Sequence, residues 1–265
     1  MKKKLIILLS LILSLGLLAG CGNSSSSDTL VVGATAKPHA EILEVVKPML
    51  AEEGVNLKIE EFTDYVLINP ALNDGQIDAN FFQHTQYLDE YNEKNGTDLT
   101  VLVKVHSEPM GVYSKSIKNL NDISEGTTIG IPNDATNGGR ALLLLEKEGL
   151  ITLKEDAGLI ATDADIVDNP KKIVIQMMDA PMLVRALEDL PVCVINSNYA
   201  IEGNLDPVND AIAKEAADSP YANVLVVRAG DENNEDMLKL AKALQSEEVK
   251  TFLEEKYQGA CVPAF

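Results

Sequence analysis

The sequence predicts an α/β protein folded in two lobes. Short β-branched runs alternate with helical patterns of about ten to fifteen residues, which is typical of a sheet whose strands are largely parallel. The pattern restarts after Pro109, and no Pro/Gly/Ser-rich linker interrupts the chain beyond residue 28. We therefore expect two lobes joined by two strand-like crossings, with Glu108 to Val112 and Tyr221 to Val227 as the candidates.

The first predicted lobe begins with the apolar run Thr29 to Val32. The helix that follows, Pro38 to Glu53, carries apolar side chains at helical spacing and ends at Gly54. Residues 29–110 and 224–265 would form this lobe. Its remaining predicted elements are Leu57 to Phe62, Val66 to Asn73, Ile77 to Phe82, His84 to Glu93, Thr100 to Val105, Val224 to Val227, and two closing helices, Glu235 to Leu244 and Glu247 to Tyr257.

The second predicted lobe is residues 111–223. Its helix Pro181 to Leu190 starts with a proline, which the first turn of a helix tolerates because that N–H has no intrahelical partner. Another helix, which contains Arg140, should end at Gly149. The strands expected around these helices are Gly111 to Ser114, Thr127 to Ile131, Lys172 to Met177 and Val192 to Ile195.

The N-terminus has the pattern of a lipoprotein signal peptide, residues 1–20. Three lysines precede an apolar stretch that is short for a membrane span, and Leu18-Ala19-Gly20-Cys21 matches a lipobox. Cys21 would carry the lipid, and the serine-rich residues 21–28 would form a flexible tether. We expect the protein on the extracytoplasmic face of the cell membrane, held there only by its lipid.

Composition and motifs exclude several functions. The 41 acidic and 22 basic residues give a net charge of −19, so nucleic acid is a poor partner. His39, His84 and His106 lack metal-ligand spacing, and no nucleophile motif or phosphate loop is present, so we expect no catalytic residue, metal or cofactor. The sequence leaves open whether Cys193 and Cys261 pair, with two separately buried thiols as the preferred interpretation.

The stretch Ile131 to Leu142 predicts a binding site for a small anion. It lies where a strand gives way to a helix, Thr136 or Asn137 could cap that helix, and Gly138 and Gly139 keep its first turn uncrowded. Exposed N–H groups at a helix N-terminus attract anions, and the Arg140 guanidinium suits a carboxylate. The alternative is a solvated loop with one surface arginine.

Other polar and aromatic clusters follow predicted strand ends. In open α/β sheets the ligand crevice lies beyond the carboxyl ends of the strands, so these clusters could meet there. We expect Phe81 to lie in the core and Asn80 in a turn, and leave Tyr199 open between core and site. The clusters are Asp64-Tyr65-Val66, Asp78 to His84 with Tyr87, Ile195 to Ala200, and Ser219 to Asn223. Together with the tether and the acidic charge, they favour a solute-binding protein, with an enzyme as the alternative.

The sequence resembles the methionine-binding lipoproteins of bacterial ABC importers, the MetQ or NlpA family. The resemblance covers nearly the whole chain after the tether, and the matching strings occur in the same order as in the family. It rests on Val32 to Thr35, Pro38 to Leu43, Asp64 to Val66, Asp78 to Asn80 with Phe82 to His84, Glu108 to Gly111, Ile131 to Leu142, Val194 to Asn196 with Asn198 to Ala200, and Ser219 to Asn223.

This resemblance implies a two-lobed, type II periplasmic-binding-protein-like fold that clamps L-methionine or a close analogue in the cleft between its lobes. It implies a monomer that delivers the ligand to an ABC transporter permease. By analogy Arg140 would hold the α-carboxylate, and Asn198 and Asn223 would bond the amino and carboxylate groups. The thioether would be walled by Tyr65, Phe82, His84 and Tyr87.

The chain departs from the family pattern at Lys37, Leu67-Ile68 and Gln176 to Met178, near the expected rim of the site. These departures bear on which ligand is chosen. The alternatives are another small amino acid or a short peptide, and, from other classes, a surface adhesion or envelope lipoprotein, or an enzyme.

Overall fold

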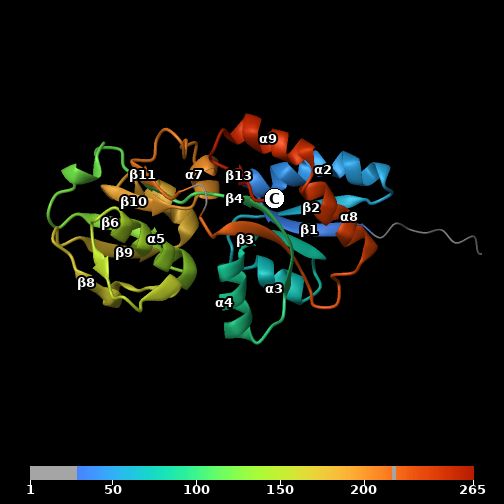
Figure 1. Cartoon of the computed structure of the whole chain (residues 1–265), viewed down its shortest axis with the longest axis horizontal. Coiled ribbons are helices and arrows are strands. Elements are labelled where there is room, and N and C mark those ends of the chain that lie inside the picture. Colours follow the sequence, from blue (N-terminus) through green and yellow to red (C-terminus); the bar gives the residue numbers. More distant parts are fainter. Residues whose placement is uncertain (1–28, 217–218) are drawn as a thin grey trace, which may run out of the picture.

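The fold consists of two mixed β-sheets, each covered by helices, that lie side by side (Figure 1). A computed structural model describes residues 29–216 and 219–265. One sheet has six strands in the order β13-β4-β12-β3-β1-β2, and the other has five in the order β11-β5-β10-β6-β9. The predicted two-lobed α/β fold is therefore confirmed. The predicted signal peptide and tether, with Cys21, lie outside the described residues.

The six-stranded sheet combines the chain up to Ser107 with the C-terminal segment from Ala222 onward. Helices η1, α2, α8 and α9 cover one face, and α3 and α4 cover the other. Its elements are β1 (Leu30–Thr35), η1 (Ala36–Ala40), α2 (Glu41–Glu52), β2 (Leu57–Phe62), α3 (Ile68–Asn73), β3 (Ala79–His84), α4 (Thr85–Asn95), β4 (Thr100–Ser107), β12 (Ala222–Val227), α8 (Glu235–Leu244), α9 (Glu247–Tyr257) and β13 (Val262–Pro263).

The five-stranded sheet is built from the middle of the chain. Helix α5 packs on one face, and α6 and α7 pack on the other. Its elements are β5 (Gly111–Tyr113), η2 (Leu120–Asp122), β6 (Thr128–Pro132), α5 (Ala135–Lys147), η3 (Gly158–Ile160), η4 (Asp163–Asp165), β9 (Val174–Met178), η5 (Ala180–Met182), α6 (Leu183–Ala186), β10 (Val192–Ile195), α7 (Ser197–Glu202) and β11 (Ala213–Lys214), with a separate hairpin of β7 (Thr152–Leu153) and β8 (Ile166–Asp168).

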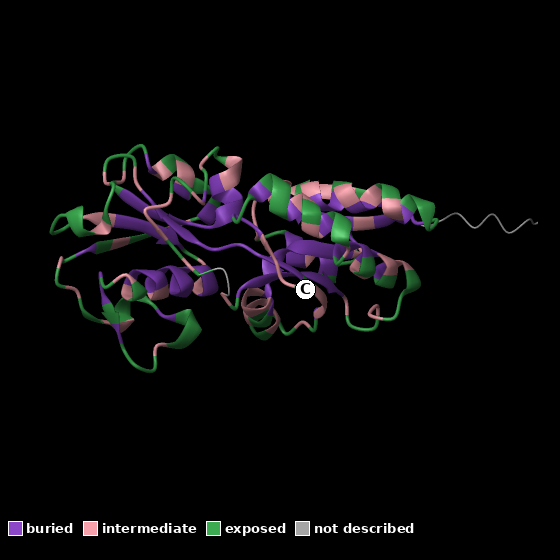
Figure 2. Cartoon of the chain, turned by 45° about the horizontal axis from the view of Figure 1, so that its top comes forward, coloured by how far each residue is buried: buried purple, intermediate pink, exposed green. Residues whose placement is uncertain are grey.

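Burial explains why these segments form. The strands are mostly buried, whereas the helices expose their outer faces (Figure 2). In α2 the residues Ile42, Leu43, Val46 and Leu50 recur at helical spacing and are almost completely buried against the sheet, as predicted. Burial of such apolar area supplies the main driving force for folding.

The sheets are less parallel than predicted. Strands β1, β2 and β3 pair in parallel, as do β6, β9 and β10, but β12 runs antiparallel to β3 and β4, and β5 runs antiparallel to β10. The chain crosses between the sheets from β4 to β5 and from β11 to β12. The strand that follows each crossing, β5 or β12, runs antiparallel to its neighbours in the sheet. The second predicted crossing was placed too late, since Ala222–Val227 already belongs to the six-stranded sheet.

The predicted helix Pro181 to Leu190 is shorter than expected. Only Leu183–Ala186 is α-helical, after a 3₁₀ turn at Ala180–Met182. The segment then turns tightly into Pro191, which precedes β10 and cannot continue a helix.

Candidate functional site

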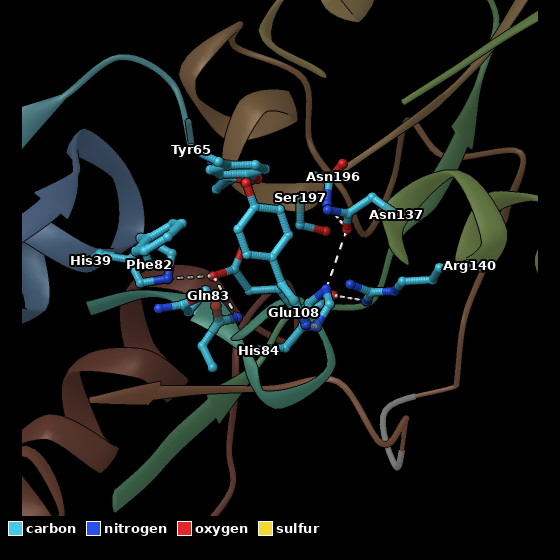
Figure 3. A pocket seen from close by; sticks show the side chains of 13 residues that line it. His39, Tyr65, Phe82, Gln83, His84, Glu108, Asn137, Arg140, Asn196 and Ser197 are labelled. Atoms are coloured by element: carbon cyan, nitrogen blue, oxygen red, sulfur yellow. Dashed lines mark hydrogen bonds and ion pairs between the residues drawn. The ribbon is translucent and has the colours of Figure 1, made fainter. Parts of the chain in front are cut away.

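A pocket lies where the two sheets and the two crossings meet (Figure 3). Its cavity volume is about 20 Å³, far below the roughly 300–1,000 Å³ of typical small-molecule sites, so the side chains that line it lie close together. The six-stranded side supplies aromatic, histidine and amide side chains, the five-stranded side supplies amides, a serine and an arginine, and the first crossing supplies a carboxylate. The lining residues are His39, Tyr65, Phe82, Gln83, His84, Tyr87, Glu108, Asn137, Arg140, Asn196, Ser197, Asn198 and Asn223.

The structure brings all seven residues that were predicted from the sequence into this one pocket. Three of them, Tyr65, Phe82 and Tyr87, form an aromatic wall. Their ring centroids lie 5.8 to 5.9 Å apart, and the Tyr87 ring meets the other two edge-on. Such a wall suits an apolar or sulfur-containing group. Phe81, on the opposite face of β3, is buried in the core as expected. Tyr199 stacks behind Tyr65 at 4.9 Å and does not line the pocket.

His84 links the two sides of the pocket. Its Nδ1 accepts a hydrogen bond from the Tyr87 N–H and caps α4, and its Nε2 lies 3.4 Å from Asn137 Oδ1 on α5. Burial and the nearby Arg140 charge lower the pKa of His84 to about 3. The ring is therefore neutral at physiological pH and contributes hydrogen bonds and an aromatic face.

Arg140 is buried and held from several sides. Its Nε donates to Glu215 Oε1 at 2.8 Å, its Nη2 donates to Glu215 Oε2 and to the Glu108 carbonyl oxygen, and its guanidinium lies 4.3 Å from the centre of the Tyr221 ring. Among the described residues, Nη1 has no hydrogen-bond partner and is not sealed from solvent. The guanidinium is thus fixed with one nitrogen left for a ligand in the pocket it lines.

The anion-binding site predicted at the start of α5 is wrong about the residue that caps the helix and about the free helix terminus. The helix begins at Ala135 and is capped by Asp134, whose Oδ1 accepts from the Asn137 N–H at 2.9 Å. Neither Thr136 nor Asn137 is the cap, and a protein carboxylate already occupies the anion position at this helix end. Arg140 lies in the second turn. Any ligand carboxylate in the pocket therefore depends on Arg140 and its amide neighbours, not on the helix terminus.

Two asparagines complete the expected set. Asn198 is buried on α7, and its Oδ1 accepts a hydrogen bond from the Tyr65 hydroxyl at 2.6 Å across the pocket. Its Nδ2 is buried with no partner among the described residues. Asn223 is buried on β12 and donates through Nδ2 to Glu108 Oε1 at 3.3 Å.

A network of buried amide side chains, from α3 and β3, lies next to the pocket. Asn69 bonds to both Asn80 and Gln83, and Gln83 also donates to Asn80 Oδ1 at 2.9 Å. Asn80 was expected in a turn, but it is a fully buried strand residue. Its amide needs partners because buried polar groups are costly when unpaired, and the network fixes Gln83, which lines the pocket.

Sequence reasoning missed the acidic centre of the pocket. Glu108, on the first crossing, lies 2.8 Å from His106 Nε2 and 3.3 Å from His39 Nε2, measured to its Oε1. All three side chains are buried. The residues come from three separate segments and show no local spacing, although His39 and Glu108 both belong to the strings that carried the family resemblance. Asn137, Asn196 and Ser197 also line the pocket; they lie in stretches that the sequence analysis singled out, but they were not predicted as ligand contacts.

The remaining cysteines are unpaired. Cys193 lies on β10 and Cys261 close to β13, both are buried, and they belong to different hydrophobic clusters. This confirms the preferred interpretation of two separate thiols.

Comparison with known proteins identifies the family. The model of the NlpA lipoprotein family matches residues 30–265. The chain belongs to this family.

Relatives of this NlpA family member are similar over almost their whole length. A protein of Vibrio cholerae named probable D-methionine-binding lipoprotein MetQ is 43% identical over 93% of this chain and 92% of its own. The methionine-binding lipoprotein MetQ of Bacillus subtilis is 39% identical over 98% of both chains. A nutrient-binding protein from Burkholderia cenocepacia, solved bound to methionine, is 45% identical and superposes with a TM-score of 0.88 over 89% of this chain and 100% of its own.

These three relatives are named as binding proteins or lipoproteins, and none of them is named as an enzyme. Within residues 29–216 and 219–265, no helix has the length and apolar character needed to cross a membrane.

Proposed function

We propose that this NlpA family member is a lipid-anchored solute-binding protein that captures methionine, or a close analogue, and delivers it to an ABC importer. The observation that carries the proposal is the pocket itself. One site combines a fixed guanidinium, a buried carboxylate and an aromatic wall, which are the groups that a zwitterionic amino acid with an apolar side chain requires. The methionine-bound Burkholderia relative supports the choice of ligand.

The carboxylate end of the ligand would lie on the five-stranded side. Arg140 Nη1 and Asn198 Nδ2 are donors with no partner among the described residues. A ligand carboxylate placed between them would satisfy both, and a buried carboxylate needs a charged partner of this kind. Asn223 would bond the amino end.

The thioether would lie against Tyr65, Phe82, His84 and Tyr87 on the six-stranded side. A polarizable sulfur packs well against aromatic edges, and His84 presents a neutral ring. The chemical identity of the ligand would thus be selected on one side of the cleft, and its α-carboxylate held on the other.

The organisation expected from the sequence completes the proposal. Lobe 1 would be residues 29–110 and 224–265, lobe 2 residues 111–223, and the ligand would bridge them. Cys21, outside the described residues, would carry the lipid that holds a monomer at the extracytoplasmic face of the membrane, within reach of the permease.

The test is ligand-dependent stability of the full chain after refolding, which releases any carried-over ligand. A ligand that binds only the folded state at 100 times its Kd stabilises by about 2.7 kcal/mol. We expect methionine to raise the melting temperature, and both enantiomers should be measured because the name of the Vibrio relative specifies D-methionine. No shift with either enantiomer, the sulfoxide or a methionyl dipeptide would refute the proposal.

A further inference from the structure

We propose that Tyr87 sets the length limit for the ligand's sulfur substituent, because it separates the pocket from a groove that has room for a longer chain. This inference rests on the proposed function, since it concerns the side-chain end of the same ligand. Removing the Tyr87 ring should therefore change the preferred ligand from methionine to a homocysteine with a larger S-alkyl group.

The groove lies on the boundary between the two sheets and has a volume of about 550 Å³. Helix α4 lines one side of it and the start of α5 lines the other, and these two helices contact each other across the boundary (Figure 1). The pocket, by contrast, has a cavity volume of about 20 Å³. A ligand side chain too long for the pocket would therefore need the space in the groove.

Tyr87 is the boundary between the two spaces. Among the described residues it alone lines both the pocket and the groove. The neighbouring walls continue from one space into the other. Tyr65 and Asn137 line the pocket, and the residues that follow them in the chain, Val66 and Gly138, line the groove. The pocket and the groove therefore adjoin at Tyr87.

The Tyr87 ring faces the pocket, and its hydroxyl lies towards the groove. The ring meets Tyr65 and Phe82 edge-on, with centroids 5.9 Å from each of them. Among the described residues the hydroxyl has no hydrogen-bond partner, yet it is not sealed from solvent. Burial raises the pKa of Tyr87, and the charges of Asp134 and Glu90, which both line the groove, raise it further. The side chain thus spans the wall between the two spaces.

The groove offers apolar surface to an alkyl chain. Val66 and Met177, from opposite sides of the boundary, are 69% and 43% exposed. An alkyl group laid against them would remove apolar surface from water, which is favourable. The apolar or aromatic side chains that line the groove besides Tyr87 are Val66, Pro70, Tyr91, Pro132 and Met177.

The groove adjoins the sulfur end of the ligand and not its carboxylate end. In the proposed orientation the thioether lies against Tyr87. Arg140 and Asn198, which would hold the carboxylate, line the pocket but not the groove. Tyr87 should therefore control the length of the side chain and leave the recognition of the carboxylate unchanged.

The experiment compares methionine with S-butyl-homocysteine of the same configuration, by calorimetry on the refolded full chain. We expect the wild-type protein to bind methionine at least about 10-fold more tightly, since even one extra methylene in a filled pocket costs about 10-fold or more. In Tyr87→Ala this preference should vanish or reverse. Each methylene that the groove then covers should strengthen binding by about 4-fold.

Three variants serve as controls. Tyr87→Phe keeps the ring and should keep the wild-type preference. Tyr91→Ala should also keep it within about 2-fold, because Tyr91 lines the groove but not the pocket. Tyr87→Leu shortens the side chain but leaves an apolar group in the wall, and should reduce the preference by an intermediate factor if Tyr87→Ala does not fold.

Two results would overturn the inference while leaving the proposed function intact. One is equal binding of both ligands by the wild-type protein, which needs no variant. The other is an unchanged preference for methionine in Tyr87→Ala and Tyr87→Leu. Failure of the wild-type protein to bind methionine at all would instead refute the proposed function.

Discussion

The hydrogen bond between Tyr65 and Asn198 offers a sharp test of how the pocket holds its ligand. The Tyr65 hydroxyl lies in the segment after β2, on the side of the six-stranded sheet, and donates to Asn198 Oδ1 on α7 at 2.6 Å. Burial raises the pKa of Tyr65 well above its usual value, so the hydroxyl stays a donor at physiological pH. This bond fixes the Asn198 amide with Nδ2 left free for a ligand acceptor.

Tyr65→Phe removes this hydroxyl and keeps the aromatic wall. A neutral hydrogen bond contributes about 0.5–1.5 kcal/mol, and an acceptor left buried without a partner costs about 1–3 kcal/mol. We therefore expect methionine affinity to fall by about 1–2 kcal/mol, or about 5- to 30-fold. The bond joins the two sides of the cleft, so the loss should appear in the binding constant much more than in the free energy of unfolding without ligand.

Isothermal calorimetry and urea denaturation of the same variant separate these two effects. Tyr91→Phe is the control, because Tyr91 packs in the same hydrophobic cluster and its hydroxyl donates to no described residue. It should leave affinity within about 2-fold. Unchanged affinity in Tyr65→Phe, or a loss of unfolding free energy with unchanged affinity, would contradict the proposed orientation of Asn198.

Two further predictions concern pH and thiols. Burial lowers the pKa of His39 to about 4 and that of His84 to about 3, so below pH 6.5 the unfolded chain binds protons that the folded chain does not. The free energy of unfolding should therefore fall as pH drops from about 6.5 towards 4, by several kcal/mol at about 1.4 kcal/mol per pKa unit; urea midpoints at pH 7 and pH 5 measure this, and His84→Gln should flatten the slope. A midpoint that does not change with pH would exclude buried neutral histidines. Cys193 and Cys261 should react with a thiol reagent only after denaturation, without prior reduction; rapid labelling of the native protein, or no labelling in denaturant, would show that they are exposed or paired.

The sequence predicts some elements with the bounds that the structure has. Leu57–Phe62, Val192–Ile195, Glu235–Leu244 and Glu247–Tyr257 are confirmed residue for residue. Their hydrophobic periodicity is regular, and the last two have a cap or stop signal at the right place. In such segments local preference and tertiary packing agree.

Prediction failed where local signals compete or where pairing is long-range. Four residues of the types that cap helices, Asn133, Asp134, Thr136 and Asn137, precede Gly138, and Asp134 is the one that caps α5. The two-residue strands β7, β11 and β13 are too short to show any period. Antiparallel pairing of β12 depends on how the chain re-enters the six-stranded sheet, which no local pattern encodes.

The seven site residues could be found because they follow strand ends or lie in strings shared with a known family. Their partners could not be found in the same way. Glu215 lies 75 positions from Arg140 in the sequence, and Glu108 meets His39 only through the folded sheet. These acidic partners set the charge of the pocket, so the sequence predicted a set of residues that line one pocket but not its electrostatics.

The structure of the complex with methionine tests the central claim most directly. We predict the α-carboxylate within about 2.7–3.2 Å of Arg140 Nη1 and the thioether against Tyr65, Phe82 and Tyr87. A ligand bound with its carboxylate and thioether ends exchanged, or bound outside this pocket, would contradict the account.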